Sequence, residues 1–146
     1  IKGLVESSSN IGILRLDEDE LFASSSVRSS VDAACSAISD KIEYLTEFLG
    51  GDYEVQGAYP AWEYREVSPL RDLMVKIFKQ QYGKEPVIQA LHAGVECGIF
   101  ASKMPGLDCV SFGPDMDDIH TTNESMNVES VRRTWEYTLK ILKELK

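Results

Sequence analysis

Short apolar stretches with frequent serines open the chain, a pattern typical of strands with one solvent-exposed face. The predicted strands are Gly3–Ser8, Ile11–Leu16 and Leu21–Arg28, with a turn at Ser9-Asn10 between the first two. The acidic run Asp17–Glu20 predicts the turn before the third strand. The chain is therefore expected to open with short strands joined by tight turns.

A long amphipathic helix is predicted next. Over Val31–Leu49, apolar residues recur at steps of four and three, which places them on one face of a helix. Ser30 is the predicted N-cap, and Asp32 suits the first turn. Gly50-Gly51 ends the helix, and Tyr53–Gly57 reads as a further strand. Strands packed with one helix make a small α+β layer.

Helix and strand signals alternate in the second part of the chain. A helix is predicted over Pro69–Tyr82, since proline suits the first turn of a helix. A second helix, Glu96–Lys103, lies between two short apolar runs. These runs, Pro86–Leu91 and Leu107–Phe112, predict buried strands. The strand–helix–strand order predicts a parallel pair with a crossover helix.

The chain is predicted to end with an irregular loop and a final helix. The loop covers Gly113–Met126, and Asn127 is the expected N-cap of the helix. The apolar stripe of this helix consists of Val128, Val131, Trp135, Leu139 and Leu142.

Composition narrows the class of protein. The chain has 146 residues, 43% of them hydrophobic, and a net charge of −9, which fits a folded soluble protein. Nucleic-acid binders present a basic face, so the acidic balance disfavours DNA, RNA and anionic lipid as partners. No apolar run approaches the roughly 20 residues that span a bilayer, and no signal peptide is recognisable. The odd, widely spaced cysteines Cys35, Cys97 and Cys109 indicate reduced thiols in a cytoplasmic protein.

His120 lies in an acidic loop and is the first candidate for chemistry. A neutral imidazole is a good zinc ligand, and a nearby carboxylate can orient its second nitrogen. Candidate carboxylates, which also attract a cation, are those of Asp115, Asp117, Asp118 and Glu124. The alternative is a solvated acidic loop that happens to contain a histidine, and composition alone favours it.

The second candidate is the run His92-Ala-Gly-Val-Glu-Cys-Gly98. Gly94 permits close approach of the backbone to a ligand, and a carboxylate at Glu96 is favourable at the start of a helix. Taken alone, Glu96 is more simply a helix-start residue and His92 a hydrogen-bonded turn residue. Cys97 is expected to be an inert thiol.

Arg28 ends the third predicted strand. A guanidinium can hold a carboxylate through two parallel hydrogen bonds, although an arginine at a strand end is usually only solvent-exposed. No serine or cysteine hydrolase arrangement and no phosphate-binding glycine loop is found.

Four stretches resemble the aminoacyl-histidine dipeptidases, dinuclear zinc peptidases also called Xaa-His dipeptidases. They are Val27-Arg-Ser-Ser30, Tyr59-Pro-Ala-Trp62 with Ser68-Pro-Leu70, His92-Ala-Gly-Val-Glu-Cys-Gly98, and Phe112-Gly-Pro114 with His120 and Glu124. Their order and spacing match the C-terminal portion of that family. Where members often have Pro-His-Ser-Pro-Asp-Glu, this chain has Ile119-His-Thr-Thr-Asn-Glu124.

The resemblance implies an α/β fold class in two parts. Residues 1–58 would be the C-terminal α+β part of a lid or dimerisation domain, and residues 59–146 the last part of a zinc-peptidase-like α/β catalytic domain. His120 matches the family's last metal ligand, and Arg28 matches a lid arginine that holds the substrate carboxylate. The resemblance places His92, Gly94 and Glu96 in a substrate-binding pocket loop.

The other metal ligands of the family and its general-base glutamate have no counterpart in these residues. For the complete protein, the resemblance implies hydrolysis of Xaa-His dipeptides by water that two zinc ions activate, with cobalt or manganese as alternatives. This chain alone would be inactive and metal-free, and would need the N-terminal remainder of the polypeptide. A homodimer through the lid is also implied. Two alternatives stay open: a non-catalytic dimerisation or peptide-binding module, and a one-metal site of His92, Glu96 and His120.

Overall fold

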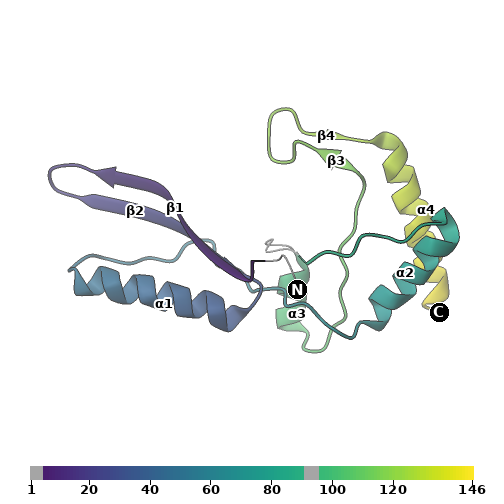
Figure 1. Cartoon of the computed structure of the whole chain (residues 1–146), viewed down its shortest axis with the longest axis horizontal. Coiled ribbons are helices and arrows are strands. Elements are labelled where there is room, and N and C mark those ends of the chain that lie inside the picture. Colours follow the sequence, from purple (N-terminus) through teal and green to yellow (C-terminus); the bar gives the residue numbers. More distant parts are fainter. Residues whose placement is uncertain (1–4, 91–95) are drawn as a thin grey trace. The chain divides into compact units, whose positions relative to one another are not determined.

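The computed structural model describes residues 5–90 and 96–146 (Figure 1). The chain divides into two compact units, each described by itself. Unit 1 runs to Tyr64 and includes Gln89–Leu107, and unit 2 comprises Arg65–Ile88 and Asp108–Lys146. The predicted boundary between residues 58 and 59 concerns the complete protein and stays a prediction. Among the described residues, no helix combines the length and apolar character needed to cross a membrane.

Unit 1 begins with one long β-hairpin. Strand β1 (Ser7–Leu16) pairs antiparallel with β2 (Leu21–Ser29), with a register shift between Ile11 and Ile13. The connecting turn is closed by Asp17, whose carboxylate accepts hydrogen bonds from the amides of the two residues before Leu21. The predicted turn at Ser9-Asn10 is wrong, because the backbone ladder to β2 continues through these residues. Local turn chemistry is overridden there by cross-strand pairing.

Helix α1 (Asp32–Phe48) packs along β2, as Figure 1 shows. The predicted N-cap, Ser30, is wrong: the cap residue is Val31, and no side chain caps the helix. Instead, the Ser29 hydroxyl accepts a hydrogen bond from the Val31 amide. The predicted strand Tyr53–Gly57 is also wrong, since that segment has no strand structure and no ladder partner among the described residues.

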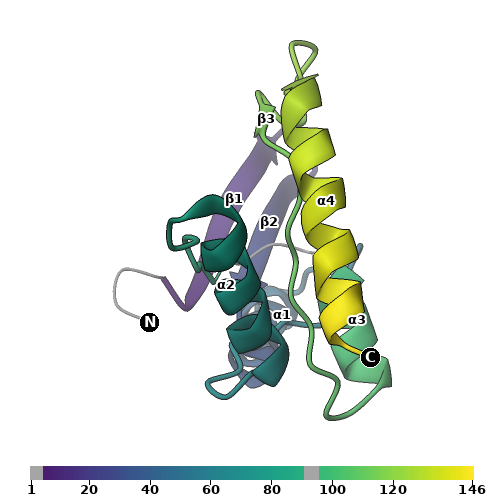
Figure 2. The same ribbon diagram turned by 90° about the vertical axis from the view of Figure 1, so that its right-hand side faces the viewer.

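The core of unit 2 lies between helices α2 (Pro69–Tyr82) and α4 (Val128–Glu144), which run side by side (Figure 2). Its four buried apolar residues are Met74, Ile77, Tyr137 and Ile141. The Tyr137 hydroxyl donates to the Met74 carbonyl at 2.7 Å. Two aromatic rings contact Tyr137 edge-on. The centres of the Phe78 and Phe112 rings lie 5.5 and 5.4 Å from the centre of the Tyr137 ring. Such edge-to-face pairs add to the stability from burial alone.

The start of α2 is capped from two directions. Pro69 has no amide hydrogen, the Leu70 amide donates to the Asp108 carboxylate at 2.9 Å, and the Arg71 amide donates to the Ser68 hydroxyl at 3.1 Å. That hydroxyl itself donates to Asp108 at 2.7 Å. All first-turn donors are therefore satisfied. The helix prediction is confirmed, including its end at Gly83, which has a left-handed φ of 67°.

The apolar runs Pro86–Leu91 and Leu107–Phe112 were expected to form a parallel pair of strands. In their described residues neither run belongs to a sheet, so this prediction is wrong. A strand needs a neighbour to satisfy its backbone groups, and the described residues provide none for these runs. The helix that follows the first run, α3 (Glu96–Lys103), is confirmed. The expected irregular loop contains a short hairpin of β3 (Met116–Asp117) and β4 (Ser125–Met126).

The predicted N-cap of α4 is confirmed, because the Asn127 side chain accepts from the Ser130 amide at 3.0 Å. The predicted stripe is not the buried face: Val128 is 80% exposed and Trp135 62%. Ser130, Tyr137 and Ile141 are buried instead. The helix carries two apolar faces, and α2 covers only one of them.

Asp108 stabilises the start of α2 in its charged form. Partial burial by itself would raise the pKa of its carboxyl. Hydrogen bonds from Ser68 and Leu70, with the nearby charges of Arg65 and Arg71, outweigh this and hold the pKa below its usual range.

We expect Asp108→Ala to lower the free energy of unfolding of the complete protein by about 1 kcal/mol near neutral pH, the usual contribution of a helix cap. Because the folded pKa is depressed, this contribution is present above the ordinary carboxyl pKa and is lost as pH falls through the folded value. Urea denaturation of wild type and variant across this acidic range measures the difference.

Asp72→Ala is the matched control, since Asp72 lies in the same first turn but is not one of the acceptors that cap α2, which are Asp108 and Ser68. The gap between wild type and Asp108→Ala should narrow in acid, while the control keeps the wild-type pH dependence of the cap. A gap that is independent of pH would contradict the assignment.

Candidate functional site

His120 lies in the loop that joins β3 to β4, and its side chain is exposed. Its φ is 68°, in the left-handed region, and Asp118 has a φ of 50°. Non-glycine residues held in this region cost on the order of 1 kcal/mol or more, so surrounding contacts must hold them there. The loop thus fixes the backbone of the histidine in an uncommon conformation.

Glu124 provides one of those contacts, because its Oε2 accepts a hydrogen bond from the His120 amide at 2.8 Å. The Thr121 amide and hydroxyl both donate to the Asp118 carbonyl, at 3.1 and 2.7 Å. The Thr121 hydroxyl in turn accepts from the Asn123 amide. The loop is therefore a closed set of short-range hydrogen bonds around the histidine.

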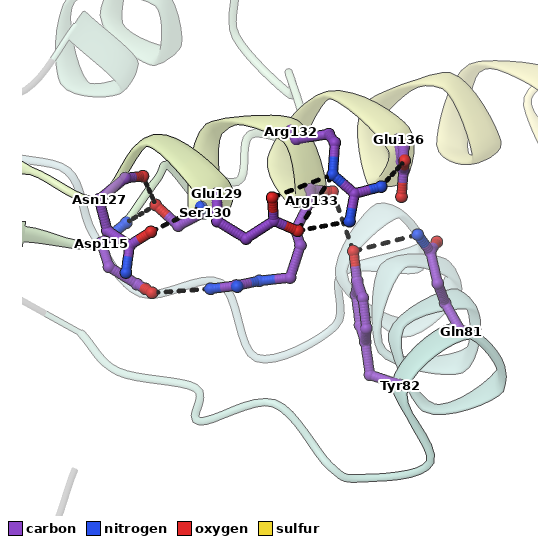
Figure 3. A network of polar contacts seen from close by, with 9 residues as sticks. All are labelled: Gln81, Tyr82, Asp115, Asn127, Glu129, Ser130, Arg132, Arg133 and Glu136. Atoms are coloured by element: carbon purple, nitrogen blue, oxygen red, sulfur yellow. Dashed lines mark hydrogen bonds and ion pairs between the residues drawn. The ribbon is translucent and has the colours of Figure 1, made fainter.

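The base of this hairpin is fastened to α4 (Figure 3). The Asp115 amide donates to the buried Ser130 hydroxyl at 2.8 Å, and the Asn127 amide donates to the Asp115 carbonyl at 3.0 Å. The Asp115 carboxylate pairs with Arg133 at 2.9 Å. The Arg133 carbonyl accepts from the hydroxyl of Tyr82 on α2, so both helices of unit 2 support the loop.

The acidic residues near His120 do not form a ready cation cage. No group of three His, Cys, Asp or Glu side chains suited to a metal is present in the described part of the chain. Asp115 is engaged by Arg133, and Glu124 accepts from the backbone of the histidine. An exposed imidazole on a hydrogen-bonded loop fits the role of a single metal ligand. A catalytic zinc generally needs three protein ligands, so the described residues fit one position of such a site and not the whole.

Arg28 lies near the end of β2, opposite Ser8, with an exposed side chain. Glu96 is the exposed first residue of α3. His92 and Gly94, the remaining predicted pocket residues, lie outside the described residues. Arg28 and Glu96 belong to unit 1 and His120 to unit 2. The predicted roles of all five residues stay predictions.

Sequence reasoning missed two carboxylates that position backbone. Asp32 was assigned only to the first turn of α1, yet its Oδ1 accepts from the Ala61 amide at 2.6 Å. Asp108, which caps α2, lies inside an apolar run that was expected to be a strand. An aspartate within an apolar run is the one local signal that could have drawn attention to it.

The model of a protein family described as peptidase family M20/M25/M40 matches residues 5–144. The cytosol non-specific dipeptidase of Escherichia coli (strain K12) is 33% identical over 144 residues, which cover 99% of this chain and 30% of that protein. The chain therefore spans less than a third of the length of this relative.

Solved structures agree with the sequence match. The crystal structure of aminoacylhistidine dipeptidase from Vibrio alginolyticus matches with a TM-score of 0.83 and 30% identity, covering 99% of this chain and 29% of that one. The aminopeptidase PepT from Bacillus cereus matches with a TM-score of 0.73 and 22% identity, over 95% of this chain and 40% of that one. The second likeness shows the fold alone. The predicted resemblance and the α/β fold class are confirmed.

Replacing Glu124 with alanine should loosen the His120 backbone, because the amide loses its acceptor and the left-handed conformation loses a support. Hydrogen–deuterium exchange of the His120 amide should accelerate about tenfold, which corresponds to roughly 1.4 kcal/mol, near the upper end of the usual net contribution of a hydrogen bond.

Glu124→Gln retains a carbonyl acceptor and should stay close to wild type. Thr122→Ala is the control within the loop, since no hydrogen bond of its side chain is among the contacts that close it. Equal exchange in wild type and Glu124→Ala would show that the contact does not hold the histidine.

Proposed function

This chain belongs to peptidase family M20/M25/M40, and we propose that it is the C-terminal portion of a metal-dependent dipeptidase that hydrolyses Xaa-His dipeptides. The observation that carries the proposal is the likeness of almost the whole chain to two dipeptidases, one in sequence and one in structure. The name of the structural relative, an aminoacylhistidine dipeptidase, supports histidine at the C-terminal position of the substrate.

Exposed apolar surface supports the view that this chain packs against further polypeptide. On α4, the side chains of Val128, Trp135 and Leu142 are exposed. Their seven-residue spacing places them on one face of the helix, as is typical of a face that packs against another element. The apolar runs around residues 86–90 and 107–112 likewise lack strand partners in the described chain. We propose that the remainder of the polypeptide covers this face and supplies the neighbouring strands.

The same remainder would supply the other metal ligands and the general base. His120 would donate one imidazole nitrogen to a divalent ion, zinc by preference, with cobalt or manganese as alternatives. When bound, such ions lower the pKa of a coordinated water and polarise the scissile carbonyl. The proposed role of this chain is thus to complete a metal site, and the chain alone would be inactive and metal-free.

The substrate would be held by residues of unit 1. Arg28 would bind the C-terminal carboxylate of the dipeptide through two parallel hydrogen bonds, a geometry that suits a planar guanidinium. His92, Gly94 and Glu96 would line the pocket beside it. Holding the carboxylate of a short substrate would orient its scissile carbonyl for attack.

Two further expectations belong to the same proposal. The relative's name describes a cytosolic enzyme, which supports a cytoplasmic location for this protein. A homodimer through the lid would use unit 1, where β1 and β2 expose apolar side chains that include Leu14, Leu16 and Leu21. That exposed hairpin is also what a non-catalytic dimerisation or peptide-binding module would present, and it makes this the second candidate function.

Arg28→Ala in the complete protein should lower kcat/KM for a Xaa-His dipeptide by roughly 30-fold or more, because a charge-paired carboxylate would lose its partner. Metal content should be unchanged. Steady-state kinetics and elemental analysis on the same preparation measure both.

Arg15→Ala is the matched control, since Arg15 lies in the same hairpin with its guanidinium 4.5 Å from the centre of the Phe22 ring. It should keep wild-type kinetics. Loss of metal from the Arg28 variant would assign the residue to another role, and absence of hydrolysis by the wild-type protein would favour the binding module.

His120→Ala should remove at least one metal ion per complete protein and abolish measurable hydrolysis, because the lost nitrogen is proposed to be a direct ligand. Metal content after dialysis is the primary measurement. A variant with Thr122→Ala in the same loop should retain its metal. Full metal occupancy in the His120 variant would rule out the ligand role.

A further inference from the structure

Helix α3 approaches the backbone of Pro60 and Ala61 at Gly98, and both elements belong to unit 1. Gly98 is the buried residue of this helix. A Cβ built on Gly98 would lie 2.7 Å from the carbonyl oxygen of Pro60 and 3.5 Å from that of Ala61. Any larger residue must push the segment away, so glycine sets how closely α3 approaches it.

The same segment is held from its other side by Asp32. The Asp32 Oδ1 accepts a hydrogen bond from the Ala61 amide at 2.6 Å, across 29 positions of sequence. Hydrogen bonds to a charged acceptor are shorter and stronger than neutral ones. Ala61 is thus fixed by its amide to the first residue of α1, while its carbonyl lies near Gly98 of α3.

Only three residues separate Asp32 from Arg28, and hydrogen bonds hold this short connection in place. The Ser29 hydroxyl accepts from the Val31 amide at 3.0 Å and lies 2.9 Å from the Ser7 hydroxyl of β1. The Ser30 amide donates to the carbonyl of Glu6 at 3.1 Å. Each residue between Arg28 and Asp32 is therefore either paired in the hairpin or bonded to its neighbours.

We propose that Asp32 is a positioning residue that ties the strand carrying Arg28 to the helix that begins at Glu96, through the backbone of Ala61 packed against Gly98. This inference rests on the proposed function, which gives Arg28 and Glu96 their places at the substrate. A displacement of reacting groups by about 1 Å can lower a rate by roughly 100-fold, so a short rigid tie between two substrate-binding elements bears on catalysis.

The tie is distinct from a general effect of Asp32 on its own helix. A carboxylate in the first turn also interacts with the helix dipole, and that effect depends on charge alone. Asparagine lacks the charge but keeps a side-chain oxygen that can accept from the Ala61 amide. Asp32→Asn therefore separates the hydrogen bond from the charge, and Asp32→Ala removes both.

Amide exchange in the complete protein tests the tie without reference to catalysis. Hydrogen–deuterium exchange of the Ala61 amide should accelerate about tenfold in Asp32→Ala and return towards wild type in Asp32→Asn. Asp40→Ala, an exposed position on the same helix, should leave it unchanged. Equal exchange in wild type and Asp32→Ala, or equal acceleration in the alanine and asparagine variants, would overturn the proposal.

Kinetics test whether the tie serves the substrate site. For a Xaa-His dipeptide, kcat/KM should fall roughly 10- to 100-fold in Asp32→Ala and stay near wild type in Asp32→Asn and Asp40→Ala. The preference for the dipeptide over its C-terminal amide should shrink in Asp32→Ala, because Arg28 is proposed to read the carboxylate. A general loss of stability would lower kcat/KM for the dipeptide and for its amide by the same factor. An unchanged ratio of the two values would therefore overturn the positioning role.

Gly98→Ala approaches the same contact from α3. Its added methyl should displace the segment, lower the same ratio, and combine with Asp32→Ala less than additively, as expected for residues that act through one contact. Full additivity would overturn the link. If the wild-type protein hydrolyses no dipeptide while Ala61 exchange responds as stated, the proposed function and with it the catalytic role of Asp32 are wrong, and the tie remains as a structural contact.

Discussion

The packing of α4 on α2 around Tyr137 is the interaction on which the His120 loop depends. Burial raises the pKa of the Tyr137 hydroxyl, and the neighbouring Tyr82 adds to the effect, so the group stays protonated and donates to the Met74 carbonyl. This contact fixes the rotation of α4 about its axis. Ser130 then lies on the inner face, where its hydroxyl accepts from the Asp115 amide at the base of the hairpin. The position of the His120 loop therefore depends on the packing of α4 against α2.

That core is small for the surface it must hold. Only four apolar side chains in the described chain are buried, while leucine, valine and tryptophan side chains on α4 and on the hairpin are exposed. Since apolar burial supplies most of the free energy of folding, the exposed apolar faces are the ones that the proposed remainder of the polypeptide would cover. The match to less than a third of a dipeptidase is consistent with this reading. Each unit thus combines locally hydrogen-bonded elements with exposed apolar side chains, on the β1–β2 hairpin in unit 1 and on α4 in unit 2.

Features with local causes could be predicted from the sequence. Proline at the start of α2, Gly83 at its end and Asn127 before α4 each act within one turn, and all three were placed correctly. Features that need a distant partner could not. The apolar runs read as strands lack ladder neighbours, and α4 carries two apolar stripes between which periodicity cannot choose. The site shows the same division: His120 was found as a loop histidine, whereas its left-handed backbone and the tie from Asp32 to Ala61 arise from contacts that no spacing reveals.

The loop around His120 also shows how one constraint can replace another. In the dipeptidase pattern that this loop resembles, prolines stand on both sides of the histidine, and prolines restrict a loop through their own fixed φ. In this chain Ile119 and Thr122 occupy those two positions, and the loop is closed instead by hydrogen bonds of Thr121 and Glu124. Proline acts whatever its neighbours do, but a hydrogen-bonded loop requires each donor and acceptor to stay in place. The geometry of the histidine in this chain is therefore set by side chains, and it is more open to change by single substitutions than a proline-bounded loop would be.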